Sequence, residues 1–212
     1  MKVPFVIVLA HQKGGVGKST LASNISVELT KICDLSVIDL DMQKSLTYFN
    51  NIRNKAGLQN LNILNINSAE ELKKTINENK NVLLIDVGGF DSDLNRVAIL
   101  GADLLITPVS DAGIELVGLL AFRNILREIK KHRPDLVASI LLNKIHTQTN
   151  SSLKPINEFI NANPEFKKIN AIIRYRVDYK KAFDSGQSVV ELNNKATNEM
   201  VVLIEEIING NN

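Results

Sequence analysis

Apolar runs and longer amphipathic stretches alternate along this chain from one end to the other. The runs predict strands at residues 3–10, 35–40, 61–66, 82–86, 104–109, 137–142 and 171–173. The stretches between them have helical spacing and predict helices near residues 17–31, 44–56, 69–78, 92–100, 113–132, 150–162, 179–185 and 194–209. Continuously apolar strands are buried on both faces, so this alternation favours an α/β fold with a mostly parallel, twisted sheet and helices on both faces.

The composition fits one globular domain. The chain has 212 residues, of which 44% are hydrophobic and 23% are charged, as in an ordinary soluble protein. No long linker, repeat or low-complexity run interrupts the alternation of strands and helices. We therefore predict a single domain over residues 1–212, with its ligand at the carboxyl ends of the strands.

Charge and cysteine content narrow the possible functions. The net charge is +2, so any contact with nucleic acid or lipid must come from local patches. The one cysteine, Cys33, excludes an internal disulfide and a four-cysteine metal site, and it fits a reducing, cytoplasmic compartment. The first apolar run is too short for a secretory signal or a membrane span.

One glycine-rich segment follows the first predicted strand and opens the first predicted helix. It reads K-G-G-V-G-K-S-T and contains the candidate nucleotide-binding residues Gly14, Gly15, Val16, Gly17, Lys18, Ser19 and Thr20. Glycines let successive N–H groups turn inward, and the helix N-terminus adds partial positive charge, so the turn becomes an anion cradle. We expect Lys18 to reach the β- and γ-phosphates and the Ser19 hydroxyl to bind Mg²⁺.

The loop departs from the usual phosphate-loop pattern at its first position. Gln12 stands where a glycine is usual, and a second lysine, Lys13, follows it. This combination resembles the deviant phosphate loop of the ParA/MinD family of ATPases. The resemblance implies a P-loop NTPase fold, with ATP and Mg²⁺ as cofactors. It also implies catalytic roles for Lys18 and for Lys13, which in that family crosses a dimer interface to touch the nucleotide of the other subunit.

Three aspartates stand at the carboxyl ends of predicted strands. Asp39 and Asp41 form a D-x-D pattern, in which Met42 replaces the proline that the family has next, and Asp86 ends a strand of the Walker B type. By resemblance, Asp39 organises the Mg²⁺ shell, Asp86 binds Mg²⁺ directly or through water, and Asp41 positions the attacking water. A solvated strand end is the alternative interpretation of the D-x-D pair. Residues 87–89, Val-Gly-Gly, replace the usual switch sequence of the family.

The sixth predicted strand ends in Asn143-Lys144-Ile145-His146. GTPases that bind guanine have N-K-x-D at this place, and their aspartate pairs with the base. His146 cannot accept both guanine donors in that way, so adenine is the favoured base. By resemblance, Asn143 contacts the adenine edge; a role as a strand cap is the alternative.

Two groups of basic side chains are candidates for nucleic-acid contacts. Arg123, Arg127, Lys130 and Lys131 share one face of the helix predicted at 113–132, which a solvated helix face also explains. The second group, with two tyrosines interleaved, consists of Lys167, Lys168, Arg174, Arg176, Lys180 and Lys181. Sequence-independent DNA binding depends on such clusters, because neutralising phosphates releases counterions. In the ParA branch, basic residues towards the C-terminus carry DNA binding.

The remaining sequence most closely resembles the small, single-domain ParA partition proteins. The last predicted helix carries three acids and no Lys or Arg over residues 198–208, unlike the basic membrane helix of a MinD-type protein. We therefore expect no membrane contact. Relatives that hold metal clusters would need paired cysteines, and this chain has one cysteine.

The ParA resemblance implies an ATP-dependent homodimer that binds non-specific double-stranded DNA. It further implies a centromere-binding, ParB-type partner that stimulates a weak intrinsic ATPase and releases the dimer. The expected location is cytoplasmic and nucleoid-associated. Two alternatives remain: a related ATPase that positions a protein cargo, and a nucleotide-gated DNA-coating scaffold with negligible turnover.

Overall fold

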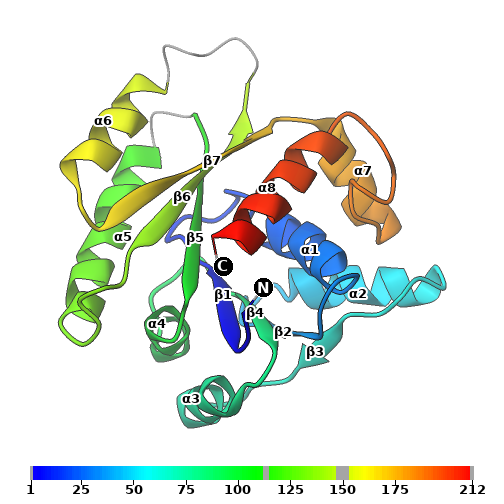
Figure 1. Cartoon of the computed structure of the whole chain (residues 1–212), viewed down its shortest axis with the longest axis horizontal. Coiled ribbons are helices and arrows are strands. Elements are labelled where there is room, and N and C mark those ends of the chain that lie inside the picture. The colour runs from blue at the N-terminus through cyan, green and yellow to red at the C-terminus, as the bar shows by residue number, and fades with distance from the viewer. Residues whose placement is uncertain (1, 112–114, 147–152, 211–212) are drawn as a thin grey trace.

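The computed structural model describes residues 2–111, 115–146 and 153–210. Within these ranges the chain forms a parallel seven-stranded sheet with the order β3-β2-β4-β1-β5-β6-β7 (Figure 1). The strands are β1 (Phe5–Leu9), β2 (Leu35–Asp39), β3 (Asn62–Leu64), β4 (Val82–Asp86), β5 (Leu104–Val109), β6 (Ala138–Ile145) and β7 (Phe166–Arg174). The predicted α/β class is confirmed.

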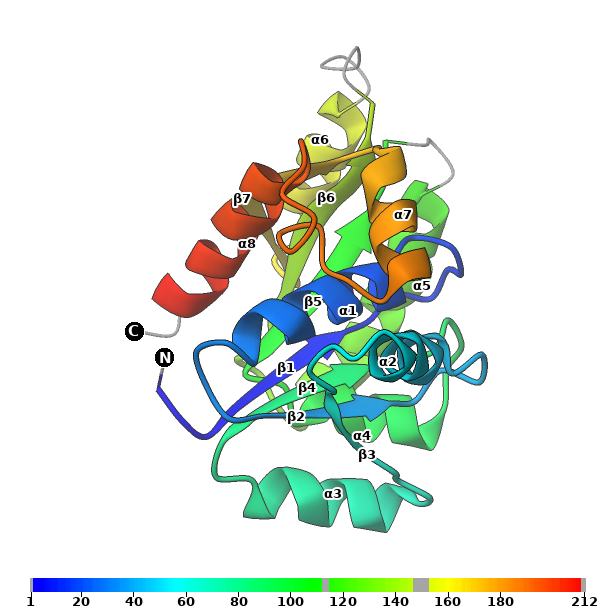
Figure 2. The ribbon, with the colours of Figure 1, turned by 90° about the vertical axis from the view of Figure 1, so that its right-hand side faces the viewer.

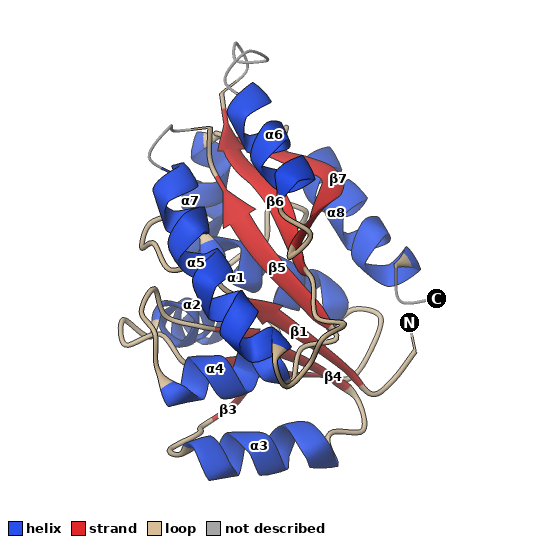
Figure 3. Ribbon diagram, turned by 90° about the vertical axis from the view of Figure 1, so that its left-hand side faces the viewer, coloured by secondary structure: helices blue, strands red, loops and turns tan. Residues whose placement is uncertain are grey.

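Helices cover both faces of the sheet. They are α1 (Lys18–Leu29), α2 (Ser45–Lys55), α3 (Ala69–Glu78), α4 (Asp93–Leu100), α5 (Glu115–Lys130), α6 (Lys154–Ala162), α7 (Val177–Ser185) and α8 (Thr197–Asn209). Figure 2 shows the side with α1, α2, α7 and α8, and Figure 3 shows α3 to α6 on the other side. Each side has its own apolar core.

The central strand β1 is buried on both faces, which explains why its sequence is apolar without interruption. Phe5, Ile7 and Leu9 of β1 point into the core beneath α1 and α8, whereas Val6 and Val8 point into the core beneath α4 and α5. Successive side chains of a strand point to opposite faces, so a strand covered on both sides needs apolar residues at every position.

The structure differs from the sequence prediction mainly in the last two strands. β7 begins at Phe166 rather than at residue 171, and β6 continues to Ile145, three residues past its predicted end. β7 is an edge strand that pairs with β6 alone. Lys167 and Lys168 are exposed there, as charged residues commonly are on sheet edges, and their charge concealed the strand in the apolar pattern. The first residues of the helix predicted from 150 lie outside the described ranges.

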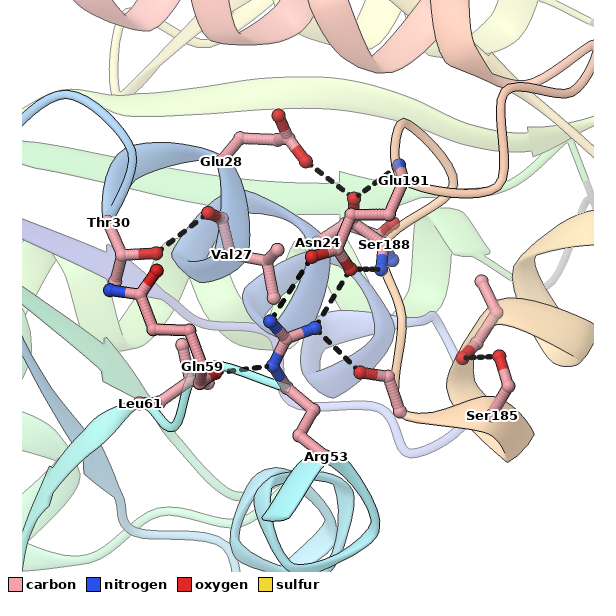
Figure 4. A network of polar contacts seen from close by, with 12 residues as sticks. Asn24, Val27, Glu28, Thr30, Arg53, Gln59, Leu61, Ser185, Ser188 and Glu191 are labelled. Carbon is pink, nitrogen blue, oxygen red and sulfur yellow. Dashed lines mark hydrogen bonds and ion pairs between the residues drawn. The ribbon is translucent and has the colours of Figure 1, made fainter. Parts of the chain in front are cut away.

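A polar network fastens the segment after α7 to two other helices (Figure 4). The buried guanidinium of Arg53, on α2, donates hydrogen bonds to the Gly186 carbonyl at 2.7 Å and to Glu191 at 2.8 Å. The Val189 N–H donates to Asn24 of α1 at 2.8 Å. Gly186 has a φ of 68°, and a Cβ atom there would lie 2.6 Å from the Arg53 backbone nitrogen. The network therefore holds α1, α2 and α7 together, and all three border the cavity described next.

Candidate functional site

A cavity of about 580 Å³ opens at the carboxyl edge of the sheet. This edge is where ligands bind in parallel α/β sheets. The cavity is lined by the glycine loop, by Asp41, by Asn143 and Lys144, and by residues of the segment from Arg174 to Asp184. The structure thus gathers several predicted site residues around one space: Gly14, Gly15, Gly17, Lys18, Ser19, Thr20, Asp41, Asn143, Arg174, Arg176 and Lys180.

The glycine loop is shaped by its own backbone and held by the end of β6. Gly15 and Gly17 have φ values of 80° and 95°, in the left-handed region that favours glycine. A Cβ atom on Gly17 would lie only 2.5 Å from the Asn143 side-chain nitrogen. Asn143 donates to the Val16 carbonyl at 2.7 Å, and Lys144 donates to the Gly15 carbonyl at 2.7 Å.

These two contacts were not expected from the sequence. Asn143 was predicted to meet the adenine edge, with a strand cap as the alternative. It lines the cavity and its amide nitrogen also donates to the glycine loop, and its contact with adenine stays a prediction. Lys144 had no predicted role, and no local signal marks it, because its partner lies 129 residues away in the chain. Both side chains donate to carbonyl groups of the loop. This fits a loop whose backbone N–H groups bind an anion.

Lys18 places a buried ammonium group at the loop. The residue is only 5% exposed, and its Nζ atom donates to the Lys13 carbonyl at 3.4 Å. Burial lowers the pKa of Lys18, while the charges of Asp86 and Asp41 oppose that change. An ammonium group at a turn with inward-facing backbone N–H groups is suited to binding a polyphosphate.

Asp86 is the most perturbed carboxyl group next to the loop. It ends β4 directly opposite Leu9 of β1 and Asp39 of β2. The side chain is fully buried, and burial raises its pKa to about 7, although the Ser19 hydroxyl acts in the other direction. Neither Asp86 oxygen is in a well-formed hydrogen bond with any part of the chain that the structure describes.

This arrangement fits a Mg²⁺ ion held jointly with phosphates. Mg²⁺ commonly binds through one or two carboxylates together with substrate phosphate oxygens and waters. Asp86 supplies a carboxylate without strong partners, and Ser19 supplies a hydroxyl beside it. The described residues contain no group of three or more His, Cys, Asp or Glu side chains that could hold a metal ion by themselves.

Asp39 and Asp41 occupy different environments. Asp39 is buried, and its Oδ2 atom accepts hydrogen bonds from the Thr47 N–H and hydroxyl, each at 2.9 Å. Its Oδ1 atom accepts from the Asp41 N–H at 3.2 Å. Asp39 therefore fixes the first turn of α2. Asp41 faces the cavity, and its Oδ1 atom accepts from the Gln43 N–H at 2.9 Å.

Lys13 lies beside α5 and is not among the residues that line the cavity. Its backbone N–H donates to Nδ1 of the buried His11 at 2.9 Å. Gly118 of α5 packs closely against this turn, since a Cβ atom there would lie 2.8 Å from the His11 ring and 3.6 Å from the Lys13 Cβ atom. The side chain of Lys13 is thus placed outside the cavity to which its neighbours belong.

The basic group on α5 is engaged within the molecule. Arg123 donates to Asn163 at 2.6 Å, Arg127 forms an ion pair with Glu165 at 2.6 Å, Lys130 donates to the Leu136 carbonyl, and Lys131 pairs with Glu128. Arg127 and Lys131 remain more than half exposed in these ion pairs. These contacts fit the interpretation of a solvated helix face.

The second basic group is spread along β7 and onto α7. Lys167 and Lys168 lie at the amino end of β7, whereas Arg174 lies at its carboxyl end, roughly 20 Å away at the rise of a strand. Arg176 is held in an ion pair with Glu199 of α8 at 2.7 Å. The two lysines of α7 are both exposed, and Lys180 also lines the cavity.

Fold and site together define the class of protein. In this protein the first strand of a parallel sheet runs into a glycine loop and a helix, with Lys18 at the end of the loop and the buried Asp86 on the neighbouring strand. This is the arrangement of a P-loop nucleotide-binding protein. The chain belongs to the family described as the CobQ/CobB/MinD/ParA nucleotide binding domain, whose model matches residues 7–189. The predicted resemblance to ParA/MinD ATPases is confirmed.

Known relatives match different shares of the chain. The maintenance of carboxysome distribution protein A of Halothiobacillus neapolitanus is 22% identical over 210 residues, which cover 96% of each chain. The protein ParA of Rhizobium radiobacter is 31% identical over 114 residues, which cover 52% of this chain and 50% of that protein. A plasmid partition protein of Borrelia burgdorferi B31, solved with AMPPNP, has a TM-score of 0.76 at 20% identity and covers 98% of this chain and 99% of its own. Among the described residues, no helix is long and apolar enough to cross a membrane.

Proposed function

We propose that this protein is an ATP-dependent DNA partition ATPase. The observation that carries the proposal is the grouping of Lys18, Ser19 and Asp41 around one cavity, with Asp86 buried next to them and a second lysine, Lys13, outside it. In this proposal ATP and Mg²⁺ close a homodimer that binds double-stranded DNA without sequence preference. A centromere-binding, ParB-type partner stimulates hydrolysis and releases the dimer from the nucleoid.

ATP hydrolysis depends mainly on positioning the reactants and neutralising charge, as other phosphoryl transfers do. The loop N–H groups and Lys18 bind the β- and γ-phosphates, and Ser19 and Asp86 hold Mg²⁺. When bound, Mg²⁺ neutralises charge on the phosphate oxygens. Asp39 keeps α2 and its preceding loop in place, so that Asp41 can orient the attacking water. Intrinsic hydrolysis is weak in this proposal, because the sequence offers no obvious arginine finger in cis. Arg176 lines the cavity but is paired with Glu199.

The test of this function is binding to random-sequence duplex DNA with ATP, with ADP and without nucleotide. Binding should require ATP and should weaken steeply between about 50 and 200 mM salt, because the contacts are made to phosphates. Absence of binding in every nucleotide state would refute the DNA-dependent cycle. Equal binding in all three states would refute its control by ATP.

Lys13→Ala is expected to abolish the ATP-dependent dimer while leaving the affinity of the monomer for ATP within about threefold of the wild type. Lys13 lies outside the cavity of its own subunit, so its charge is proposed to act on the nucleotide of the second subunit. Light scattering with ATP measures the dimer fraction, and Lys73→Ala, an exposed lysine on α3, is the control. A dimer fraction equal to that of the wild type would contradict this role.

Asp41→Ala is expected to lower the rate of ATP hydrolysis about 100-fold, the usual scale for losing a group that activates water. The ATP-bound dimer should still form and should stay on DNA. Single-turnover hydrolysis and DNA dissociation rates measure the two effects. If DNA release continued at the wild-type rate, the protein would act as a nucleotide-gated scaffold rather than as a hydrolysis-driven partition ATPase.

Positioning of a protein cargo is the second candidate function. It is supported by the similarity to the carboxysome distribution protein over 96% of both chains. Deleting the gene separates the two candidates. A partition ATPase predicts loss of a DNA molecule from daughter cells, whereas a cargo-positioning ATPase predicts normal DNA inheritance with a misplaced protein assembly.

A further inference from the structure

The cavity has two chemically different ends. The glycine loop with Lys18 and Ser19 follows β1, whereas Arg174 and Tyr175 follow β7, which is three strands further along the sheet. These two groups form the two ends of the cavity. A nucleoside triphosphate with its phosphates on the glycine loop must therefore direct its base towards the second end. This step rests on the proposed function, because it takes the ligand to be a nucleotide.

Tyr175 offers an aromatic surface at that second end. The residue lines the cavity and is 64% exposed. Its backbone N–H donates to the Ile145 carbonyl at 3.0 Å, which holds the residue next to the end of β6. On either side of it, the Arg174 N–H and the Arg176 guanidinium both bind Glu199 of α8, so the backbone around the tyrosine is held in place.

His146 supports the tyrosine ring from one side. The imidazole and phenol rings are stacked, with centroids 5.0 Å apart and planes 19° from parallel. His146 is itself tied to the end of β5, since its N–H donates to Asp111 at 3.0 Å and its Nδ1 atom lies 3.3 Å from the other Asp111 oxygen. The ends of β5, β6 and β7 are thereby linked through one carboxylate and two stacked rings.

We propose that Tyr175 is the stacking surface for the nucleobase and that His146, anchored by Asp111, is the positioning residue that holds its ring. Every base has a π-face, so stacking adds affinity for the base and little choice among bases. The choice of adenine then depends on the edge contacts. In the sequence, Tyr175 lies within a basic group that was a candidate for DNA binding. Its position in the cavity lining favours a contact with the nucleotide instead.

The experiment compares Mg²⁺-ATP with inorganic tripolyphosphate, which carries the phosphates without a base. Tyr175→Ala should weaken ATP binding about tenfold, within the range of one base stack, and should leave tripolyphosphate binding unchanged. Tyr175→Phe keeps the ring and should bind ATP as the wild type does. Tyr48→Ala is the matched control, because Tyr48 is 62% exposed but lies outside the cavity lining.

His146→Ala should weaken ATP binding about threefold, again without effect on tripolyphosphate, and should add nothing in the Tyr175→Ala background, since coupled residues are not additive. The proposal is overturned if Tyr175→Ala binds ATP as tightly as the wild type, including the case in which only DNA binding falls. It is also overturned if tripolyphosphate binding falls as much as ATP binding. Failure of the wild type to bind ATP would instead refute the proposed function.

Discussion

Replacing Lys18 with alanine is expected to weaken the binding of Mg²⁺-ATP about 100-fold. Lys18 is a buried residue, 5% exposed as a whole, and the charges of Asp86 and Asp41 act on its ammonium group. Its charge-assisted bonds to phosphate oxygens are formed away from water, where each contributes about 1.5–3 kcal/mol. A loss of about 2.7 kcal/mol corresponds to the 100-fold change. Isothermal titration calorimetry with Mg²⁺-ATP measures it directly.

The nucleotide-free Lys18→Ala protein should unfold at a temperature close to that of the wild type. ATP should raise the melting temperature of the wild type but not of the variant, because a ligand stabilises the folded state only when it binds. Lys74→Ala, another exposed lysine of α3, should behave as the wild type does. An ATP affinity for Lys18→Ala within about threefold of the wild type would rule out its role at the phosphates.

Asp86→Asn is expected to remove a pH dependence from the stability of the nucleotide-free protein. Burial raises the pKa of Asp86 to about 7 in the folded state, above its unfolded value near 4. The folded state therefore holds the proton more tightly, and the stability that it contributes is lost as the pH rises through 7. Relative to Asp86→Asn, the wild type should lose about 2–3 kcal/mol of unfolding free energy between about pH 5 and pH 8.

Urea denaturation of both proteins at the two pH values measures this difference. Asp135→Asn is the control, because the Asp135 side chain is 74% exposed and its removal should leave the pH dependence of the wild type intact. Mg²⁺-ATP should stabilise the wild type more than Asp86→Asn at about pH 8, where a bound cation compensates for the buried charge. A difference between wild type and Asp86→Asn that stays constant with pH would contradict the prediction.

The parts of the site that could be predicted from the sequence are those formed by residues close to one another in the chain. The turn around Gly17 and Lys18 is local, since a strand, a glycine loop and a helix follow one another directly. Asp86 was located in the same way, as the acid that ends an apolar strand. The left-handed φ of Gly17 and the burial of β1 on both faces follow from the same short-range patterns.

What only the tertiary structure decided depends on which strand ends become neighbours. Asn143 and Lys144 hold the glycine loop from across the sheet, and Tyr175 lines the same cavity as that loop. The separation of Lys167 and Lys168 from Arg174 follows from the length of β7, an edge strand whose exposed lysines concealed its start. Local patterns determine which residues can bend, bind phosphate or be buried, whereas sheet order determines which of them meet, because contacts between distant segments arise only when the helices and strands pack.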